Sequence, residues 1–312
     1  MPCRSEWSSI ETKWVELLSY DVSPDKVQNM VSIRQIGRTI APMLPSRLEW
    51  ALKGLYLKLY HRSYLPLTYA REARSDPAVR EEFGIDIVPP PHLRHRVCGT
   101  PDLRAYLEGG RNSVETIKTA LANHGVDLCD PGPVLDFGCG CGRLAHWWTR
   151  DFPNHAYLGL DIDSDAIAWD KEHLRSGRFE ANSGNPPTEF NTGAFGLIIS
   201  VSVFTHIDEG LQMAWLNELQ RLARPGAVIL ATVHSEKLVK RLAPVWQREI
   251  RDKGFGFFRQ DIMPKGFPSF YQAAFHTRAY VDSHWSNFFE VIDHVEMDFH
   301  DLVVMRKRDA MH

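Results

Sequence analysis

The chain has 312 residues, of which 44% are hydrophobic and 24% are charged, and its formal net charge is −3 at pH 7. This length suits one large domain or a domain with a sizeable attachment. A near-neutral charge excludes a general basic field for nucleic acid, and no apolar run approaches the ~20 residues of a membrane span, so neither partner is expected.

Residues 1–95 are predicted to form an N-terminal helical extension, and residues 96–312 the main domain. Four leucines at helical spacing would form one apolar stripe of the extension: Leu48, Leu52, Leu55 and Leu59. The run from Val88 to His92 contains three consecutive prolines. It is therefore expected to be a stiff, non-helical connector.

A helix is predicted from Asn112 to His124. Asn112 and Glu115 have the spacing of an N-cap and capping-box pair, and Gly125 would end the helix. The preceding segment, from Cys98 to Gly110, is expected to be a loop.

Strand-like segments alternate with amphipathic helices after residue 134. The expected strands are Val134–Phe137, Tyr157–Leu160, Arg178–Ala181, Leu197–Ser202 and Ala227–Val233. The expected helices are Arg143–Thr149, Ser164–Leu174 and Leu211–Ala223. Such alternation predicts a parallel sheet covered on both faces. Two further strands, Phe289–Val295 and Asp301–Met305, are joined by a short link and must therefore form an antiparallel hairpin.

The first strand runs into three glycines at alternate positions, Gly138, Gly140 and Gly142. Glycine permits positive φ and lets a ligand approach the backbone, and the helix that follows offers unpaired N–H groups. The spacing is G-x-G-x-G, whereas the dinucleotide fingerprint is G-x-G-x-x-G. Asp136, directly before the turn, would repel a pyrophosphate but would suit a cationic or amine-bearing ligand.

Five cysteines occur, at positions 3, 98, 129, 139 and 141. An odd count, with two cysteines inside the glycine turn, is typical of reduced thiols in a cytosolic protein. The first residues lack the apolar core of a signal peptide. We therefore expect a cytoplasmic protein. Cys139 and Cys141 have no second Cys/His pair at ligand spacing, so no metal site is expected.

Polar residues follow the second and third strands, where ligands of open parallel sheets bind. Asp161 can accept two hydrogen bonds from a ribose diol, and the alternative role of helix N-cap suits Asp163 or Ser164 better. Asn182 is a candidate for an adenine contact, with a simple turn-forming role as the alternative.

Three histidines are candidates for a general base, because the unperturbed pKa of histidine lies near neutrality. His206 follows the fourth strand, His234 follows the fifth, and His276 comes later in the chain. No spacing singles out one of them. His206 is as readily interpreted as a packed side chain that holds its loop.

The segment from Val134 to Gly142 resembles the first signature motif of class I S-adenosylmethionine-dependent methyltransferases. Leu158–Asp163 is similar to their second motif, Phe195–Ile207 to the fourth, and Leu219–Gly226 to the segment that leads to the fifth strand. The resemblance covers about residues 96–306. It implies an α/β, Rossmann-like, seven-stranded and mostly parallel sheet with an antiparallel C-terminal hairpin, here preceded by the helical extension.

The resemblance implies S-adenosylmethionine as the cofactor. The cofactor-binding residues it implies are Asp136, Phe137, Gly138, Gly140, Gly142, Asp161, Ile162, Asn182 and Val201. Asp136 would face the cofactor's ammonium, Asp161 its ribose hydroxyls, and Ile162 and Asn182 its adenine. The glycines would shape the pocket for the methionine part. We expect the N-terminal helices and the segment from Cys98 to Gly110 to cover this cofactor.

The implied reaction is transfer of a methyl group to a small-molecule or glycan acceptor, with O-methylation expected. The nearest resemblance is to a bacterial group that carries Ser202–His206 after strand four and a Tyr-Gln…Phe-His segment late in the chain. Its members are often associated with tailoring of glycans or secondary metabolites. Tyr271 and Gln272 are candidates for substrate binding, with core packing as the alternative.

Three other functions remain open from the sequence. A peptide or protein could be the methyl acceptor, because the late aromatic segment could hold a side chain as readily as a sugar. A nicotinamide-dependent oxidoreductase is disfavoured by the glycine spacing. A non-catalytic protein that keeps the cofactor fold as a scaffold would bind the cofactor without turnover.

Overall fold

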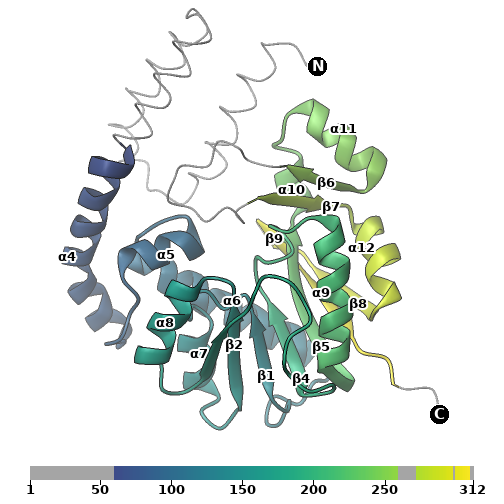
Figure 1. Ribbon diagram of the computed structural model, residues 1–312, viewed down its shortest axis with the longest axis horizontal. Helices are drawn as coiled ribbons and strands as arrows, with labels where there is room; N and C mark the ends of the chain where they lie inside the picture. Colours follow the sequence, from purple (N-terminus) through teal and green to yellow (C-terminus); the bar gives the residue numbers. More distant parts are fainter. Residues whose placement is uncertain (1–59, 259–271, 298, 310–312) are drawn as a thin grey trace, which may run out of the picture.

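The computed structural model describes residues 60–258, 272–297 and 299–309 (Figure 1). The helices are η2 (Tyr60–Tyr64), α4 (Leu65–Phe83), α5 (Pro91–Cys98), α6 (Leu103–Asn123), α7 (Ala145–Asp151), α8 (Ser164–His173), α9 (Glu209–Leu222), α10 (Glu236–Val239), α11 (Pro244–Lys253), α12 (Arg278–His284) and η3 (Trp285–Asn287). The strands are β1 (Val134–Phe137), β2 (Tyr157–Asp161), β3 (Arg178–Ala181), β4 (Phe195–Ser200), β5 (Ala223–His234), β6 (Phe255–Phe258), β7 (Ala273–His276), β8 (Glu290–Val295) and β9 (His300–Arg306). The predicted leucine stripe from Leu48 to Leu59 lies outside the described residues.

The main sheet has seven strands in the order β3-β2-β1-β4-β5-β9-β8. Strands β1 to β5 pair in parallel, whereas β9 pairs antiparallel with both β5 and β8. This confirms the predicted sheet and its C-terminal hairpin. The chain moves outwards from β1 in both directions, so the strand order reverses between β1 and β4. Ligands bind beyond the carboxyl ends of the strands at such a reversal.

Helices cover both faces of the sheet, because strand side chains alternate between two apolar layers. Val134 and Leu197 belong to the core beneath α6, α7 and α8. Their neighbours Leu135 and Ile198 belong to the core beneath α9 and α12. The sheet is therefore the middle layer of three (Figure 1), as the alternation of strands and helices in the sequence predicted.

The predicted strand ends are right to within a few residues. β1 and β3 match the prediction at both ends, whereas β4 begins and ends two residues earlier than predicted. β5 begins at Ala223, where the prediction still placed a helix. The backbone N–H of Ala223 bonds to Leu219 and closes α9, while its φ and ψ are already extended.

Helix α6 begins nine residues before the predicted start at Asn112. The N-cap is Asp102, whose side chain accepts a hydrogen bond from the N–H of Ala105. The segment up to Gly110 is therefore largely helical, and its prediction as a loop was wrong. Glycine lowers helix propensity, but a Cβ at Gly110 would lie 2.6 Å from the carbonyl oxygen of Arg143. Close packing on the turn after β1 thus requires glycine inside this helix.

Helix α5 begins within the predicted Val88–His92 connector. Pro91 is its first residue, a position where proline costs no hydrogen bond, so only the residues before Pro91 are non-helical. The helix runs across the predicted division between residues 95 and 96. That division of the chain into an extension and a main domain stays a prediction.

A small subdomain between β5 and β8 was not predicted. α10 and α11 pack with the antiparallel ribbon of β6 and β7 around their own apolar cluster, which includes Leu242, Phe258 and Phe275. The N–H of Ala274 in β7 donates to the carbonyl of Thr205 at 2.8 Å. The ribbon is thereby fixed beside the carboxyl ends of β4 and β5 (Figure 1).

The N-terminal helices are joined by the buried side chain of Arg94 on α5. Its two terminal nitrogens donate to both carboxylate oxygens of Asp76 on α4, each at 2.9 Å. It also donates to the carbonyls of Pro89 and Pro101 at 2.8 and 2.9 Å. The guanidinium is fully buried, so these four bonds replace its hydration.

Replacing Arg94 by alanine is expected to destabilise the protein by about 3–5 kcal/mol, because it leaves the carboxylate of Asp76 buried without its cation. Urea unfolding followed by circular dichroism measures the change in free energy. Arg104→Ala is the control, since Arg104 pairs with Glu82 at the exposed surface and its loss should change little. Equal stabilities for the two variants would contradict this role of Arg94.

Candidate functional site

The turn after β1 adopts a backbone conformation that only glycine tolerates well. The φ angles of Gly138, Gly140 and Gly142 are +85°, +57° and +74°. A Cβ at Gly138 would lie 2.1 Å from Cγ2 of Val203, and one at Gly140 would lie 2.6 Å from Cγ2 of Val97. The turn is therefore held tightly between the side chains of Val203, in the loop after β4, and Val97, on helix α5.

Asp161, the last residue of β2, holds this turn. Its Oδ2 accepts a hydrogen bond from the N–H of Gly140 at 2.7 Å, and its Oδ1 accepts one from the N–H of Asp163, also at 2.7 Å. Burial raises the pKa of Asp161, while these N–H groups counteract the rise. The side chain of Asp163 is the N-cap of α8, as predicted, so Asp161 does not have that role.

Asp136, the third residue of β1, is almost fully buried behind the turn. The hydroxyl of Tyr157 donates to its Oδ2 at 2.5 Å, but Oδ1 has no hydrogen-bond partner among the described residues. Burial raises its pKa to about 7, the hydrogen bond from Tyr157 lowers it, and the charge of Asp161 raises it further. A ligand cation near Oδ1 would relieve this penalty.

Asp170, on α8, is a third buried acid beneath the turn, which the sequence analysis did not identify. It is fully buried, and neither of its carboxylate oxygens has a hydrogen-bond partner within the described part of the chain. Burial raises its pKa to about 9, and the charges of Asp161 and Asp136 add to the rise. The sequence did contain a sign of this buried acid. Asp170 follows Ile167 by three residues and therefore lies on the apolar face of α8, where unpaired acids are rare.

Ile162 and Asn182 lie at the carboxyl ends of β2 and β3, as predicted. Ile162 is 41% exposed, so its side chain is available to a planar ligand. A Cβ at Gly184 would lie 2.6 Å from Cδ1 of Ile162, so the two loops meet there. Oδ1 of Asn182 accepts a hydrogen bond from the N–H of Gly184 at 2.7 Å. The side-chain amide NH2 is the group that Asn182 could offer to a ligand.

Phe137 and Val201 occupy different environments. The side chain of Phe137 packs in the core against Trp215, with ring centroids 4.4 Å apart, and only its backbone borders the turn. The carbonyl oxygen of Val201 lies 4.0 Å from the position of a Cβ on Gly138. Val201 therefore lies beside the turn, whereas the side chain of Phe137 is buried in the core.

The loop after β4 contains a strained residue. Ser202 has a φ of +64°, which L-amino acids rarely adopt, and its N–H donates to Oγ1 of Thr232 on β5 at 2.7 Å. Such strain persists only where neighbouring structure enforces it, and it is common at functional sites. The conformation carries the chain away from the end of β4 and past the glycine turn.

His206 and His234 lie close together at this edge, their rings perpendicular and their centroids 6.4 Å apart. Nδ1 of His206 donates to the carbonyl of Gln272 at 2.7 Å, and Nδ1 of His234 to that of Ala274 at 2.9 Å. Because a carbonyl can only accept, Nδ1 carries the proton in both rings. Burial lowers both pKa values, that of His234 to about 3 with a contribution from the charge of His206.

His276 is fully buried and takes part in a different network. Its Nε2 donates to Oε1 of Gln212 at 2.8 Å. The amide of Gln212 in turn donates to the carbonyls of Phe204 and Ile207, both at 3.0 Å. Burial lowers the pKa of His276 to about 3. These bonds hold the loop after β4, which favours a structural role for His276.

The two predicted substrate residues are only partly described. Gln272 is half-buried, and its backbone carbonyl holds the ring of His206. Tyr271 lies outside the described residues.

A cavity of about 460 Å³ lies beside His300. It is lined by Thr116, Lys237, Glu296, Met297, Phe299 and His300. The ring of His300, at the start of β9, stacks on that of His234 with centroids 5.5 Å apart and an interplanar angle of 25°. The ring of His300 therefore lies between the cavity and His234, at the edge of the sheet where the parallel strands end.

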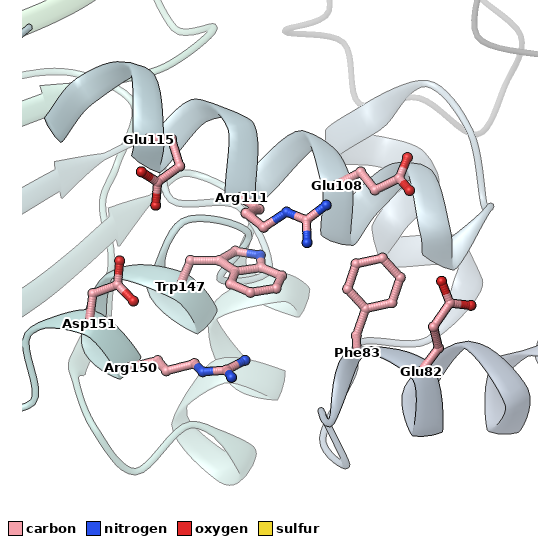
Figure 2. A pocket seen from close by; sticks show the side chains of 8 residues that line it. All are labelled: Glu82, Phe83, Glu108, Arg111, Glu115, Trp147, Arg150 and Asp151. Carbon is pink, nitrogen blue, oxygen red and sulfur yellow. The ribbon is translucent and has the colours of Figure 1, made fainter. Parts of the chain in front are cut away.

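A second cavity, of about 440 Å³, lies on the outer face of the helical layer (Figure 2). Glu115 and Asp151 each pair with Lys118 at 2.8 Å, while Arg111 and Arg150 lie over the ring of Trp147. All of its lining residues come from α4, α6 and α7. It does not belong to the edge where the strands end.

Residues 135–229 match the family model of a methyltransferase domain. Among curated proteins, the malonyl-[acyl-carrier protein] O-methyltransferase of Pectobacterium atrosepticum is 27% identical over 123 residues, 37% of this chain and 44% of that protein. The fatty-acid O-methyltransferase of Mycolicibacterium smegmatis is 26% identical over 186 residues, 58% of this chain and 61% of that protein. The chain thus spans about half the length of these relatives.

Solved structures with a similar arrangement include a SAM-dependent methyltransferase of Methanosarcina mazei, with 15% identity and a TM-score of 0.45 over 57% of this chain and 93% of that one. The 1,6-didemethyltoxoflavin-N1-methyltransferase of Burkholderia thailandensis has 15% identity and a TM-score of 0.47 over 78% of this chain and 91% of that one.

The family match extends from β1 into β5 and contains the glycine turn, Asp161 and the loop after β4. Together with the sheet order, it defines a methyltransferase domain of the class I type, as the sequence motifs predicted. The methyl donor of this class is S-adenosylmethionine.

Asp170→Asn is expected to stabilise the protein at alkaline pH. The unfolded chain releases this proton near pH 4, whereas the folded chain holds it up to about pH 9, so the stability of the wild type must fall as the pH rises through this window. The variant removes that loss, which is worth at least about 1 kcal/mol near pH 8. Thermal unfolding at acid and alkaline pH measures it. A variant that is no more stable than the wild type at alkaline pH would show that Asp170 is ionised in the folded protein.

Proposed function

We propose that this protein transfers a methyl group from S-adenosylmethionine to an oxygen atom of a small-molecule acceptor. The observation that carries the proposal is the carboxylate of Asp161, which closes the glycine turn through the N–H of Gly140 while it stands at the carboxyl end of β2. Each of its oxygens accepts one backbone hydrogen bond and retains a lone pair for a ribose hydroxyl.

The residues around the turn fit a cationic nucleoside cofactor. Oδ1 of Asp136 is a buried acceptor without a partner in the described structure, and the cofactor's ammonium would satisfy it. Asp161 and the ionised form of Asp136 disfavour a diphosphate by like charge, whereas burial keeps Asp170 protonated at neutral pH. Ile162 and the amide of Asn182 would lie against the adenine. This acidity also supports the proposal over a nicotinamide-dependent oxidoreductase.

S-adenosylmethionine supplies a methyl group on a sulfonium centre that is already activated for transfer. The protein has to hold the acceptor oxygen in line with the breaking bond and to exclude water, which accounts for much of the acceleration in such reactions. We assign the acceptor to the cavity beside His300, because it adjoins His234 at the edge where the parallel strands end.

For a hydroxyl acceptor, we propose His234 as the general base. The carbonyl of Ala274 fixes its tautomer, so Nε2 carries the lone pair that can accept a proton. Phe275 and His300 stack on the ring, with centroids 4.5 and 5.5 Å away, and hold its orientation. His206 supports this arrangement from the side.

A carboxylate acceptor is the second candidate. Burial lowers the pKa of His234 to about 3, which makes it a weak base, and a carboxylate has no proton to lose at neutral pH. The names of both curated relatives denote O-methylation of compounds that carry a carboxyl group, a malonyl thioester and a fatty acid. A glycan would be an acceptor of the first kind, a hydroxyl that needs a general base.

A cytoplasmic location is part of the proposal. Within the described structure, Cys129, Cys139 and Cys141 are free thiols. Within the described ranges, no helix has the length and apolar character needed to cross a membrane.

Asp161→Ala should weaken binding of S-adenosylmethionine by roughly 10- to 100-fold, because it removes charge-assisted hydrogen bonds to the ribose worth about 1.5–3 kcal/mol. Isothermal titration calorimetry measures the affinity. Glu172→Ala, an exposed change on α8, is the matched control and should bind as the wild type does. An unchanged affinity in Asp161→Ala would refute the ribose assignment.

His234→Gln should lower kcat for a hydroxylated acceptor by about 100-fold or more while cofactor affinity stays the same. Release of S-adenosylhomocysteine from a panel of sugars, phenols and fatty acids identifies the acceptor and gives kcat. Because the ring is already neutral, the pH profile should show no inflection near the ordinary histidine pKa of about 6.5. His284→Gln, at an exposed position of α12, is the control. Full activity of His234→Gln on a fatty acid alone would favour the carboxylate candidate.

A further inference from the structure

Helix α5 lies directly against the glycine turn. A Cβ at Gly140 would lie 2.6 Å from Cγ2 of Val97, the penultimate residue of this helix. The hydroxyl of Tyr106 on α6 donates to the carbonyl of Cys141 in the turn at 2.7 Å. Packing therefore holds α5 against the turn, and a hydrogen bond holds the neighbouring helix α6 there.

Arg96, next to Val97, reaches from α5 to the loop between β2 and α8. Its Nη1 donates to Oδ1 and Oδ2 of Asp163 at 2.9 and 2.8 Å, and Asp165 accepts from Nη1 and Nη2 at 3.2 Å. The side chains of Arg96 and Asp163 are only 24% and 11% exposed, so this pair is less screened by solvent than a surface ion pair.

These contacts continue to the proposed ribose carboxylate. The backbone N–H of Asp163 donates to Oδ1 of Asp161, whose Oδ2 accepts from Gly140. Arg96 therefore holds one end of a short chain of hydrogen bonds that runs through Asp163 to Asp161 and ends in the glycine turn. Only Ile162 separates the two acids, so a shift of Asp163 must move Asp161.

We propose that Arg96 is a positioning residue, which acts through Asp163 to keep the carboxylate of Asp161 in the orientation that accepts the ribose hydroxyls of the cofactor. The inference rests on the proposed function and assigns an indirect part in cofactor recognition, through Asp163, to a helix that precedes β1. A purely structural Arg96 would anchor α5 without any effect on the ribose contact.

The two roles differ in their effect on ribose recognition. The test compares the affinity for S-adenosylhomocysteine with that for its 2′-deoxy analogue, by calorimetry, in the wild type and in Arg96→Ala. The wild type should prefer the ribose form by roughly tenfold, the value of one charge-assisted hydrogen bond, and this preference should fall below about threefold in Arg96→Ala. Arg96→Lys, which keeps the charge but not the paired geometry, should lie between the two.

Asp163→Asn is a second variant that preserves folding, because asparagine is also a good N-cap for α8. It should reduce the ribose preference in the same direction as Arg96→Ala. Arg104→Ala, which breaks an exposed ion pair on α6, is the control and should keep the full preference. Equal losses of affinity for both ligands, with the preference unchanged, would overturn the inference. Failure of the wild type to bind S-adenosylhomocysteine would instead overturn the proposed function.

Discussion

The bond from the backbone N–H of Gly140 to the carboxylate of Asp161 ties the glycine turn after β1 to the end of β2. The positive φ of the turn, the packing of Val97 on Gly140 and the capping of α8 by Asp163 all depend on where this carboxylate lies. A backbone bond to a buried carboxylate is short, charge-assisted and directional, so it fixes both loops at once. The proposed cofactor site is the space that these two loops enclose.

The electrostatics of the site follow from burial. Asp136 and Asp170 are buried and Asp161 is half-buried; desolvation raises the pKa of all three, and the charge of Asp161 raises the pKa values of Asp136 and Asp170 further. Without a bound cation, the folded protein carries these acids at a cost in stability. A cofactor with an ammonium and a sulfonium would repay part of that cost on binding, whereas a diphosphate would add to it.

Two segments outside the β1–β5 repeat complete the edge of the sheet. The helices before β1 lie on the glycine turn, and the subdomain between β5 and β8 supplies the carbonyl that fixes the tautomer of His234. Both segments are attached to the central fold by polar contacts: the hydroxyl of Tyr106 donates to the carbonyl of Cys141, and the N–H of Ala274 donates to the carbonyl of Thr205. We infer that they adapt a common cofactor-binding fold to one particular acceptor.

The sequence by itself determined the central fold, because strand alternation, the glycine spacing and the position of Asp161 are local patterns with a period or a fixed offset. Predicted strands 134–137 and 178–181 therefore match β1 and β3 at both ends. Only the tertiary structure decided which residues from distant parts of the sequence are in contact. Helix α6 continues through Gly109 and Gly110 because the turn packs on Gly110, and His276 is bound to Gln212, 64 residues away, although it looked equivalent to His234. Such contacts depend on packing between segments that are far apart in the sequence, so they cannot be predicted from local residue spacing.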